Sequence, residues 1–204
     1  MKKLSSDVFV RDSDYTGRPF FRRKVNKTLL SSIFDWIQAG VVSVIIVALI
    51  MTFVLRVVDV SGESMMETLL DGDKVVVYSL MYTPAQGDIV IVSHARKLDE
   101  PIVKRVIATE GQTVDIDYST GKVYVDGAEI QEPYLEHTIE GLRTAYDDVQ
   151  FPCVVPEDTV FVLGDNRPVS LDSRSSIIGF IKCEDVIGKA IFVLYPFNRF
   201  GGVD

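Results

Sequence analysis

Three short segments of this 204-residue sequence carry side chains suited to a hydrolytic reaction. Ser64 lies in VSGESMMETL (60–69), Lys104 lies in IVKRVIATEG (102–111), and LGDNRPVSLDSR (163–174) follows near the C-terminal end. A serine hydroxyl becomes an effective nucleophile only when a base takes its proton. Lysine can act as that base when its amine is neutral. Together the segments indicate a serine protease that works without histidine.

The setting of Lys104 favours a neutral amine. An ordinary lysine has a pKa of about 10.4, so a base that works near neutrality needs a pKa lower by about 2–3 units. Burial among apolar side chains lowers the pKa because it disfavours the ammonium. Alternation along a strand places Lys104 on one face with Ile102 and Val106. Arg105 then points the other way, toward solvent or an acidic partner. Taken alone, Lys104 would be interpreted as a solvent-exposed strand residue, and the neighbouring motifs favour the catalytic interpretation.

The residues before Ser64 favour an exposed backbone amide. Gly62 stands two positions earlier and permits unusual backbone angles, so the Ser64 amide could face a scissile carbonyl and stabilise its oxyanion. Taken alone, a serine after a glycine is most often a turn residue. Only eight residues separate Ser64 from Arg56, at most about 27 Å of extended chain.

An apolar stretch precedes Ser64 and predicts a membrane anchor. Residues 39–55 carry no charge, and an extension back to Ile33 adds only Asp35. A helix over residues 33–55 would be about 34 Å long, which is enough for a bilayer core of about 30 Å. The alternatives are a buried helix of a soluble protein and a cleavable signal peptide. The latter is disfavoured because the apolar run is too long and no small-x-small site follows it.

Charge is distributed unevenly along the chain and predicts an orientation. Residues 1–30 hold eight Lys/Arg and three Asp/Glu, whereas the remainder holds 13 basic and 26 acidic residues. Since basic residues near a span tend to stay cytoplasmic, we expect a cytoplasmic segment at 1–30, a transmembrane helix at 31–56 and an extracytoplasmic domain at 57–204. The acidic outer domain argues against nucleic acid as a partner.

The segment after the helix shows the pattern of a β protein. Short β-branched runs separated by turn residues predict strands at 74–79, 88–94, 102–109, 121–127, 159–165 and 189–195. Residues 113–130 alternate and predict a hairpin. Residues 137–150 predict a loop or irregular insert, and residues 1–30 are too polar for fixed structure. We therefore expect a mainly antiparallel β domain behind a single N-terminal transmembrane helix.

The remaining chemistry-bearing residue types do not form a second motif. Cys153 and Cys183 could form a disulfide in an oxidising compartment, or both could be buried free thiols. His94 and His137 are isolated and are interpreted as surface or structural residues. No metal, nucleotide or other cofactor site is visible, and acyl transfer by serine and lysine requires none.

The three segments resemble the conserved boxes of bacterial type I signal peptidases, peptidase family S26. These are membrane-anchored serine proteases that remove signal peptides from exported preproteins. S-M-x-x-T-L around Ser64, K-R-V at Lys104 and G-D-N-R-x-x-S-x-D-S-R occur in the family's order. The single N-terminal span, Gly62 and the closing IGKAIFVLYPFNRFG resemble the Gram-positive subtype. The resemblance implies a β-rich catalytic core with an apolar surface on the bilayer.

The resemblance also implies roles for matching positions. Ser64 would be the acylated nucleophile and Lys104 the general base, with Ser170 hydrogen-bonded to Lys104. Support would come from ion pairing by Asp165, Asp172 and Arg174, and from a loop shaped by Asn166 and Arg167. Residues implied to bind the substrate's small side chains at −1 and −3 are Val60, Gly62, Met65, Leu69, Ile102 and Val103. Implied partners are signal peptides of preproteins with A-x-A-like sites, membrane lipid and a nearby protein-export translocon.

The chain departs from the family pattern at Glu67, at Gly62 and in the A-T-E-G-Q sequence after Lys104, which replaces the common G-L-P-G-D. Glu67 stands where the family usually has proline, and an anion close to Lys104 would raise its pKa, so we expect Glu67 to point away. Gly62 lacks the hydroxyl that some relatives use at the oxyanion. One alternative is therefore a catalytically impaired homologue that binds signal peptides or regulates export. Another is a relative of the self-cleaving Ser-Lys repressor peptidases, which the membrane span disfavours.

Overall fold

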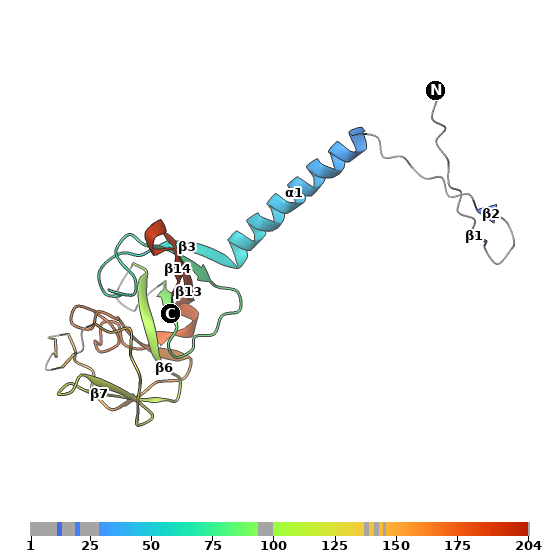
Figure 1. Cartoon of the computed structure of the whole chain (residues 1–204). Helices are drawn as coiled ribbons and strands as arrows, with labels where there is room; N and C mark the ends of the chain where they lie inside the picture. Colours follow the sequence, from blue (N-terminus) through green and yellow to red (C-terminus); the bar gives the residue numbers. More distant parts are fainter. Residues whose placement is uncertain are drawn as a thin grey trace. The chain divides into compact units, whose positions relative to one another are not determined.

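The computed structural model describes residues 12–13, 19–20, 29–93, 100–136, 139–140, 143–144 and 146–203 (Figure 1). The chain divides into two compact units, Met1–Ile46 and Val47–Asp204. His94 and His137 lie outside the described residues, as does most of the segment 1–30 for which the sequence predicts no fixed structure.

A long apolar helix dominates the described part of the first unit and continues into the second. Helix α1 spans Leu29–Phe53, after a short antiparallel pair of β1 (Asp12–Ser13) and β2 (Pro19–Phe20). The stretch Ser31–Phe53 has a mean hydropathy of 2.3 and is long enough to cross a membrane. Its side chains from residue 33 onward are exposed, so the protein itself does not bury this apolar surface. A helix that is apolar on all sides suits a lipid environment.

The helix ends earlier than the range 31–56 expected from the sequence. Leu55–Asp59 form strand β3, which pairs antiparallel with β4 (Lys74–Tyr78), with Leu55 opposite Tyr78 and Asp59 opposite Lys74. The physical reason is that β4 offers backbone donors and acceptors to residues 55–59, which hydropathy alone does not register. The strand thereby starts the β fold immediately after the apolar helix.

The main sheet of the second unit is antiparallel throughout. Its strand order is β12-β11-β6-β5-β13-β4-β3, and β14 pairs with β13. The strands not yet defined are β5 (Ile89–Val92), β6 (Ile102–Thr109), β11 (Thr159–Leu163), β12 (Ile181–Lys182), β13 (Val186–Tyr195) and β14 (Gly201–Gly202). Two 3-10 turns, Cys183–Asp185 and Phe197–Arg199, flank β13.

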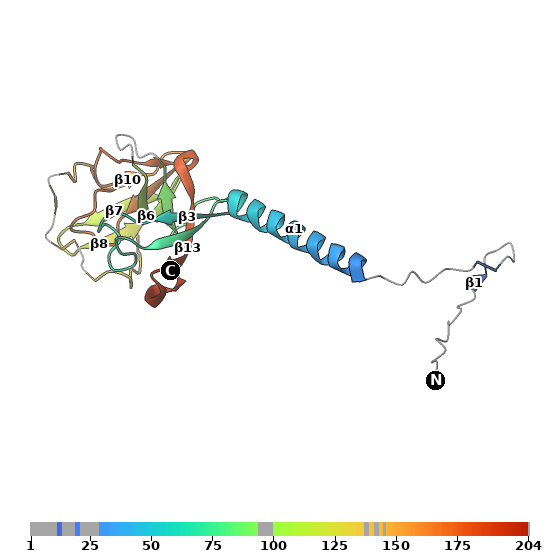
Figure 2. The same cartoon turned by 90° about the horizontal axis from the view of Figure 1, so that it is seen from above.

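A smaller antiparallel sheet has the order β10-β7-β8-β9. Its strands are β7 (Thr113–Asp117), β8 (Lys122–Val125), β9 (Ala128–Glu129) and β10 (Cys153–Val154). Figure 2 shows β7, β8 and β10 gathered at one side of the unit. The predicted hairpin at 113–130 is confirmed, and the described residues of 137–150 contain no helix or strand. The mainly antiparallel β class is confirmed as well.

Three apolar clusters fill the second unit and position the motif-bearing segments. One cluster lies between β3, β4 and β13 and includes Met65 and Leu69 from the loop after β3. A second fills the space between β7, β8 and β11, and a third includes Val106 of β6 and Val162 of β11. Because β6 contributes residues to all three, its position is set from both faces.

Candidate active site

The segment that carries Ser64 is a closed loop between β3 and β4. The Val60 amide donates to the Asp73 carbonyl at 2.8 Å, and the Gly72 amide donates to the Val60 carbonyl at 2.9 Å. Within the loop, Met65 and Leu69 are at most 1% exposed and are buried in the first apolar cluster. These anchors leave Ser64 partly exposed directly above the core. Because Ser64 directly precedes the buried Met65, its backbone has little freedom to move, as a nucleophile requires.

Lys104 reaches Ser64 from the middle of β6. Its Nζ donates to Ser64 Oγ at 2.6 Å and to the Val103 carbonyl at 3.0 Å. The side chain is 3% exposed. Burial lowers the pKa of Lys104 to about 8, an effect that Asp172 and Asp165 partly oppose. An amine with this pKa is neutral in a useful fraction of molecules near neutrality and can then accept the hydroxyl proton.

The backbone around Ser64 leaves a donor for an oxyanion. Among the described residues, the Ser64 amide donates no hydrogen bond, while its carbonyl accepts one from the Asn166 amide at 3.0 Å. Gly62 adopts a φ of +90°, a conformation that favours glycine, and its amide donates to Asp71 Oδ1 at 2.8 Å. The Asn166 side chain also donates to the Glu63 carbonyl at 3.0 Å. The loop is thus fixed with the Ser64 amide unused.

Asp165 in the third segment pairs with the residue that follows Lys104. Arg105 Nε and Nη2 donate to the two Asp165 oxygens at 2.9 and 2.8 Å, and the two side chains are 3% and 0% exposed. Of the two environments expected for Arg105, solvent or an acidic partner, the structure has the acidic partner. Thr68 Oγ1 also donates to Asp165 Oδ2 at 2.6 Å. Asp165 therefore connects β6, the Ser64 loop and its own segment.

Asp172 and Arg174 form a second buried pair behind Lys104. Arg174 Nε and Nη2 donate to the Asp172 carboxylate at 2.8 and 2.9 Å, and neither side chain is exposed. Burial would raise the pKa of Asp172, but the Arg174 guanidinium outweighs this effect, so the pKa lies below its ordinary value. Asp147, from the irregular insert, lies 3.6 Å from Arg174 Nη1. The Asp172 oxygen also accepts from the Gly164 amide at 3.1 Å.

Ser170 does not make the hydrogen bond to Lys104 that the resemblance implied. Its Oγ is buried and has no hydrogen-bond partner among the described residues. It lies against Gly164, where an added Cβ would overlap both the Ser170 hydroxyl and the Ser64 carbonyl. The reason is that Lys104 Nζ donates its hydrogen bonds to Ser64 Oγ and to the Val103 carbonyl instead. Gly164 is the residue whose missing side chain allows this close approach.

The residues expected to bind substrate are not all on one side of β6. Val60, Met65, Leu69 and Val103 share the first apolar cluster beneath Ser64 and are at most 9% exposed. Ile102 instead packs with the third cluster, because successive side chains of a strand point to opposite faces. Gly62 is exposed. The structure therefore brings four of these side chains together and separates Ile102 from them.

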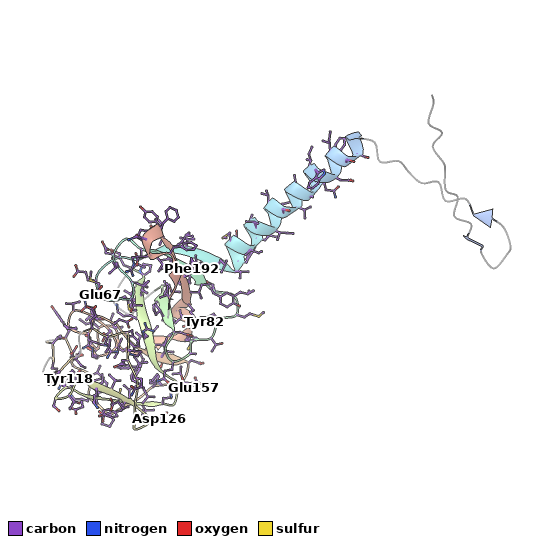
Figure 3. The ribbon with its side chains drawn as sticks, viewed as in Figure 1. Glu67, Tyr82, Tyr118, Asp126, Glu157 and Phe192 are labelled. Atoms are coloured by element: carbon purple, nitrogen blue, oxygen red, sulfur yellow. The ribbon has the colours of Figure 1, made fainter. Side chains whose placement is uncertain are left out.

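A cavity of about 200 Å³ adjoins the Ser64 loop. It is lined by Met66, Glu67, Glu136, Asp165 and Asn166. Glu67 is exposed at the edge of the unit, and Figure 3 shows it well separated from Asp126 at the β8–β9 turn. The charged groups that shift the Lys104 pKa are Asp172, Asp165 and Arg174. Glu67 is not among them, and the direction expected for its side chain stays a prediction.

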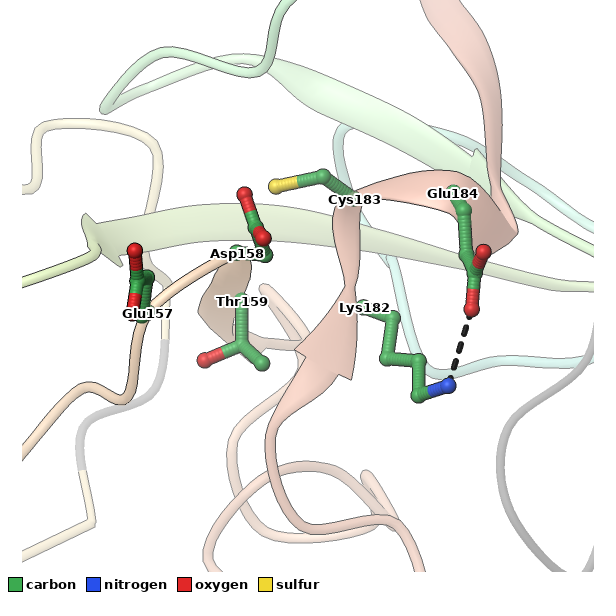
Figure 4. A pocket seen from close by; sticks show the side chains of 6 residues that line it. All are labelled: Glu157, Asp158, Thr159, Lys182, Cys183 and Glu184. Carbon is green, nitrogen blue, oxygen red and sulfur yellow. Dashed lines mark hydrogen bonds and ion pairs between the residues drawn. The ribbon is translucent and has the colours of Figure 1, made fainter.

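Another cavity, of about 480 Å³, is lined by none of the residues predicted to form the site. Its lining is Glu157, Asp158, Thr159, Lys182, Cys183 and Glu184, with Lys182 paired to Glu184 at 2.8 Å (Figure 4). Cys153 and Cys183 are both free thiols, so the expected disulfide alternative is wrong, and both are partly exposed rather than buried as the other alternative expected. Within the described part of the chain, no three His, Cys, Asp or Glu residues are grouped to hold a metal ion.

Several residues that support the site are not identified by sequence reasoning. They are Thr68, Glu132, Tyr134, Asp147, Gly164 and Arg199. Arg199, for example, donates to the Thr68 carbonyl at 3.0 Å from 131 residues further along the chain. No local spacing signals such a contact. Thr68 and Gly164 lie inside the motifs, and the position of Gly164 before Asp165 could have suggested a close backbone approach.

Comparisons with known proteins agree on one family. The sequence model described as "Signal peptidase, peptidase S26" matches residues 33–195. "Signal peptidase I" of Bacillus licheniformis is 35% identical over 180 residues, which cover 85% of this chain and 95% of the relative. "Signal peptidase IB" of Staphylococcus aureus is 34% identical over 182 residues, covering 82% and 92%. A crystal structure of a signal peptidase I from Enterococcus faecalis is 29% identical, covers 53% of this chain and 97% of that chain, and has a TM-score of 0.40.

Proposed function

This chain belongs to the signal peptidase family, peptidase S26, and is a serine peptidase that removes signal peptides; we propose that Ser64 and Lys104 are its catalytic dyad. The observation that carries the proposal is the 2.6 Å contact between Lys104 Nζ and Ser64 Oγ. A nucleophile and its base must lie within hydrogen-bond reach, and this pair does. No histidine is needed in this arrangement.

The proposed reaction is acyl transfer followed by hydrolysis. Neutral Lys104 takes the hydroxyl proton as Ser64 Oγ attacks the scissile carbonyl carbon, and the unused Ser64 amide donates to the oxyanion. The resulting ammonium gives its proton to the leaving amine, which departs as the new N-terminus of the mature protein. Lys104, neutral again, then takes a proton from water as the water attacks the acyl ester. The Lys104 ammonium returns that proton to Ser64 Oγ as the ester bond breaks, and the signal peptide leaves with a new carboxyl group that ionises in water.

The two buried ion pairs have separate roles in this proposal. Arg105–Asp165 holds β6 and the Ser64 loop together, since Thr68 of that loop also bonds Asp165. Asp172 and Arg174 place opposite charges near the amine, and their effects on the Lys104 pKa have opposite signs. Burial therefore remains the dominant influence on the base.

We propose that Val60, Met65, Leu69 and Val103 form the apolar floor for the small side chains at −1 and −3. They lie in one cluster beneath Ser64, which supports this assignment. Ile102 faces another cluster, so its share in that floor receives no support from the geometry. Gly62, at the exposed rim of the loop, would contribute backbone. Ser170 would close the site behind Gly164 through packing.

The family is membrane-anchored, and this chain has one N-terminal apolar helix. We further propose that residues 1–30 are cytoplasmic, that the membrane segment expected at 31–56 is α1, and that residues 57–204 lie outside the membrane, because residues 1–30 carry the basic excess. Exposed apolar side chains of the second unit support contact with lipid; among them are Leu194, Tyr195, Phe197 and Phe200. Proximity to the export translocon follows from the nature of the substrate.

Incubation of the full chain in detergent with a preprotein that has an A-x-A site tests the proposal. Sequencing of the product should show a new N-terminus directly after that site. Ser64→Ala and Lys104→Ala should remove turnover by at least about a thousandfold while the fold is retained. Full activity of Lys104→Ala near neutral pH would refute the proposed base.

The same preparation separates a peptidase from a homologue that only binds signal peptides. An acylating serine reagent should label Ser64 of the wild-type chain and should not label Ser64→Ala. Binding of preprotein without labelling or cleavage would instead indicate the impaired homologue.

A further inference from the structure

We propose that Glu132 and Tyr134, in the segment 130–136 after β9, are positioning residues for the Ser64–Lys104 dyad. The proposal rests on the proposed function. Glu132 acts through Arg167 of the third segment, and Tyr134 acts through Arg105 of β6. Neither belongs to the three motifs that carry the chemistry.

Glu132 neutralises a guanidinium that has no access to water. The Arg167 side chain is 0% exposed and that of Glu132 is 8% exposed. Arg167 Nη1 donates to Glu132 Oε2 at 3.2 Å, and Nη2 donates to Oε1. Such a two-point pair fixes the plane of the guanidinium as well as its place. Removal of the carboxylate would leave a buried charge without its partner, which proteins strongly disfavour.

The fixed guanidinium in turn holds the backbone next to the nucleophile. Arg167 Nε donates to the Gly164 carbonyl at 3.0 Å. Gly164 lies against the Ser64 carbonyl, and two residues later the Asn166 amide donates to that same carbonyl at 3.0 Å. A shift of the Arg167 side chain therefore moves the backbone that sets the position of Ser64.

Tyr134 completes the connection on the side of the base. The Arg105 guanidinium lies over the Tyr134 ring, 3.8 Å from its centroid, and the Tyr134 hydroxyl donates to Glu132 Oε1 at 2.9 Å. A cation that is stacked on an aromatic face is held in one plane. Arg105 directly follows Lys104 and bonds Asp165 through two nitrogens. Burial raises the pKa of Tyr134 above its ordinary value, so the hydroxyl stays a donor.

The segment 130–136 thus contacts Arg167, which supports the Ser64 side of the dyad, and Arg105, which supports the Lys104 side. Glu132 binds the segment that touches Ser64, and Tyr134 covers the residue beside Lys104. The direct bond between Glu132 and Tyr134 couples the two contacts. The relative position of hydroxyl and amine, on which the reaction depends, is set in part by this coupling.

The test compares Glu132→Gln and Tyr134→Phe with a matched control in the full chain. The control is Glu129→Gln, the same chemical change three residues earlier, where Glu129 makes a surface pair with Lys122 and is 40% exposed. For each variant, kcat and KM for one preprotein, the rate of Ser64 acylation by a small reagent, and the melting temperature are measured. All rates are taken below the onset of melting, per folded molecule.

Glu132→Gln should lower kcat and the acylation rate by about tenfold or more, with KM within about threefold, because a misplaced nucleophile slows chemistry more than binding. Tyr134→Phe, which keeps the ring, should lower both rates by about threefold. Glu129→Gln should behave as wild type. A wild-type acylation rate in folded Glu132→Gln would overturn the proposal.

Two further outcomes are decisive. If Glu132→Gln does not fold, Tyr134→Phe decides, and a wild-type kcat in Tyr134→Phe overturns the proposal. If wild type does not cleave the preprotein, or if Ser64→Ala still cleaves it, the proposed function fails instead. The acylation rates would then still report whether Glu132 positions Ser64.

Discussion

The pH dependence of cleavage tests whether Lys104 is the base. Burial lowers its pKa from 10.5 to about 8. At pH 7, about 9% of such amines are neutral, compared with about 0.03% of ordinary lysines. The neutral fraction rises from about 1% at pH 6 to about 50% at pH 8. We therefore expect kcat/KM to rise about 50-fold between these two values and to level off above about pH 9.

The assay is the rate of Ser64 acylation in single turnover, from pH 5.5 to 9.5, beside kcat/KM for a preprotein over the same range. If the acylation rate and kcat/KM rise with the same midpoint pH, the titrating group acts in the chemical step. Lys104→Arg serves as the control, since a guanidinium stays protonated in this range. Its rate should be lower by at least about a hundredfold at every pH and should show no rise near pH 8.

Two results would refute the reasoning. A midpoint near 10.5 would mean that the amine is not desolvated in the active protein. A flat profile between pH 6 and 8 would mean that no group with the pKa of buried Lys104 limits the reaction. Either result would mean that Lys104 is not the base for Ser64, despite the 2.6 Å contact between them.

Two other predictions concern the stability of the site. Lys104→Met should stabilise the inactive protein by up to about 3 kcal/mol at pH 7, because the native state no longer has to bury an ammonium. Between about pH 8 and 10.5 the unfolded lysine binds a proton that the native one does not, so the wild-type chain becomes more stable as pH rises through this range. The free energies of unfolding of the wild-type chain and Lys104→Met should therefore differ less at pH 10 than at pH 7. Gly164→Ala should lower the free energy of unfolding by about 1–3 kcal/mol and slow Ser64 acylation by at least about tenfold, since the added methyl overlaps Ser170 Oγ and the Ser64 carbonyl. Denaturant titration and labelling rates check both effects, and wild-type values would show that the backbone at 164 can move without consequence.

The class of fold could be predicted because it follows from local patterns. The β-branched runs after residue 57 form antiparallel strands, and the long apolar run forms α1. The end of that helix could not be predicted, because Leu55–Asp59 become a strand only when β4 is beside them. Hydropathy describes how apolar a segment is, whereas strand formation by Leu55–Asp59 depends on hydrogen bonds to β4, about 20 residues further along the chain.

In the candidate site, too, local patterns predicted some features, while others depend on residues distant in the sequence. The alternation of β6 predicted that Arg105 points away from Lys104, toward either solvent or an acidic partner. In the structure Arg105 is buried and pairs with Asp165. The implied bond from Ser170 to Lys104 is absent, because it depended on side-chain directions that spacing does not define. Glu132 had no signal in the sequence, since its partner Arg167 lies 35 residues further along the chain.

From residue types and spacing alone came the candidate hydroxyl and amine, together with the apolar helix and the β class, while the family resemblance of the motifs implied the supporting carboxylates. These are properties of short stretches, and short stretches are what a sequence displays. Only the tertiary structure decided that the amine is nearly sealed from water, that it lies 2.6 Å from the hydroxyl, and that Glu132 and Tyr134 brace the two arginines around it. The pKa of a buried group and the distance between two strands depend on everything packed around them, and that packing exists only once the chain has folded.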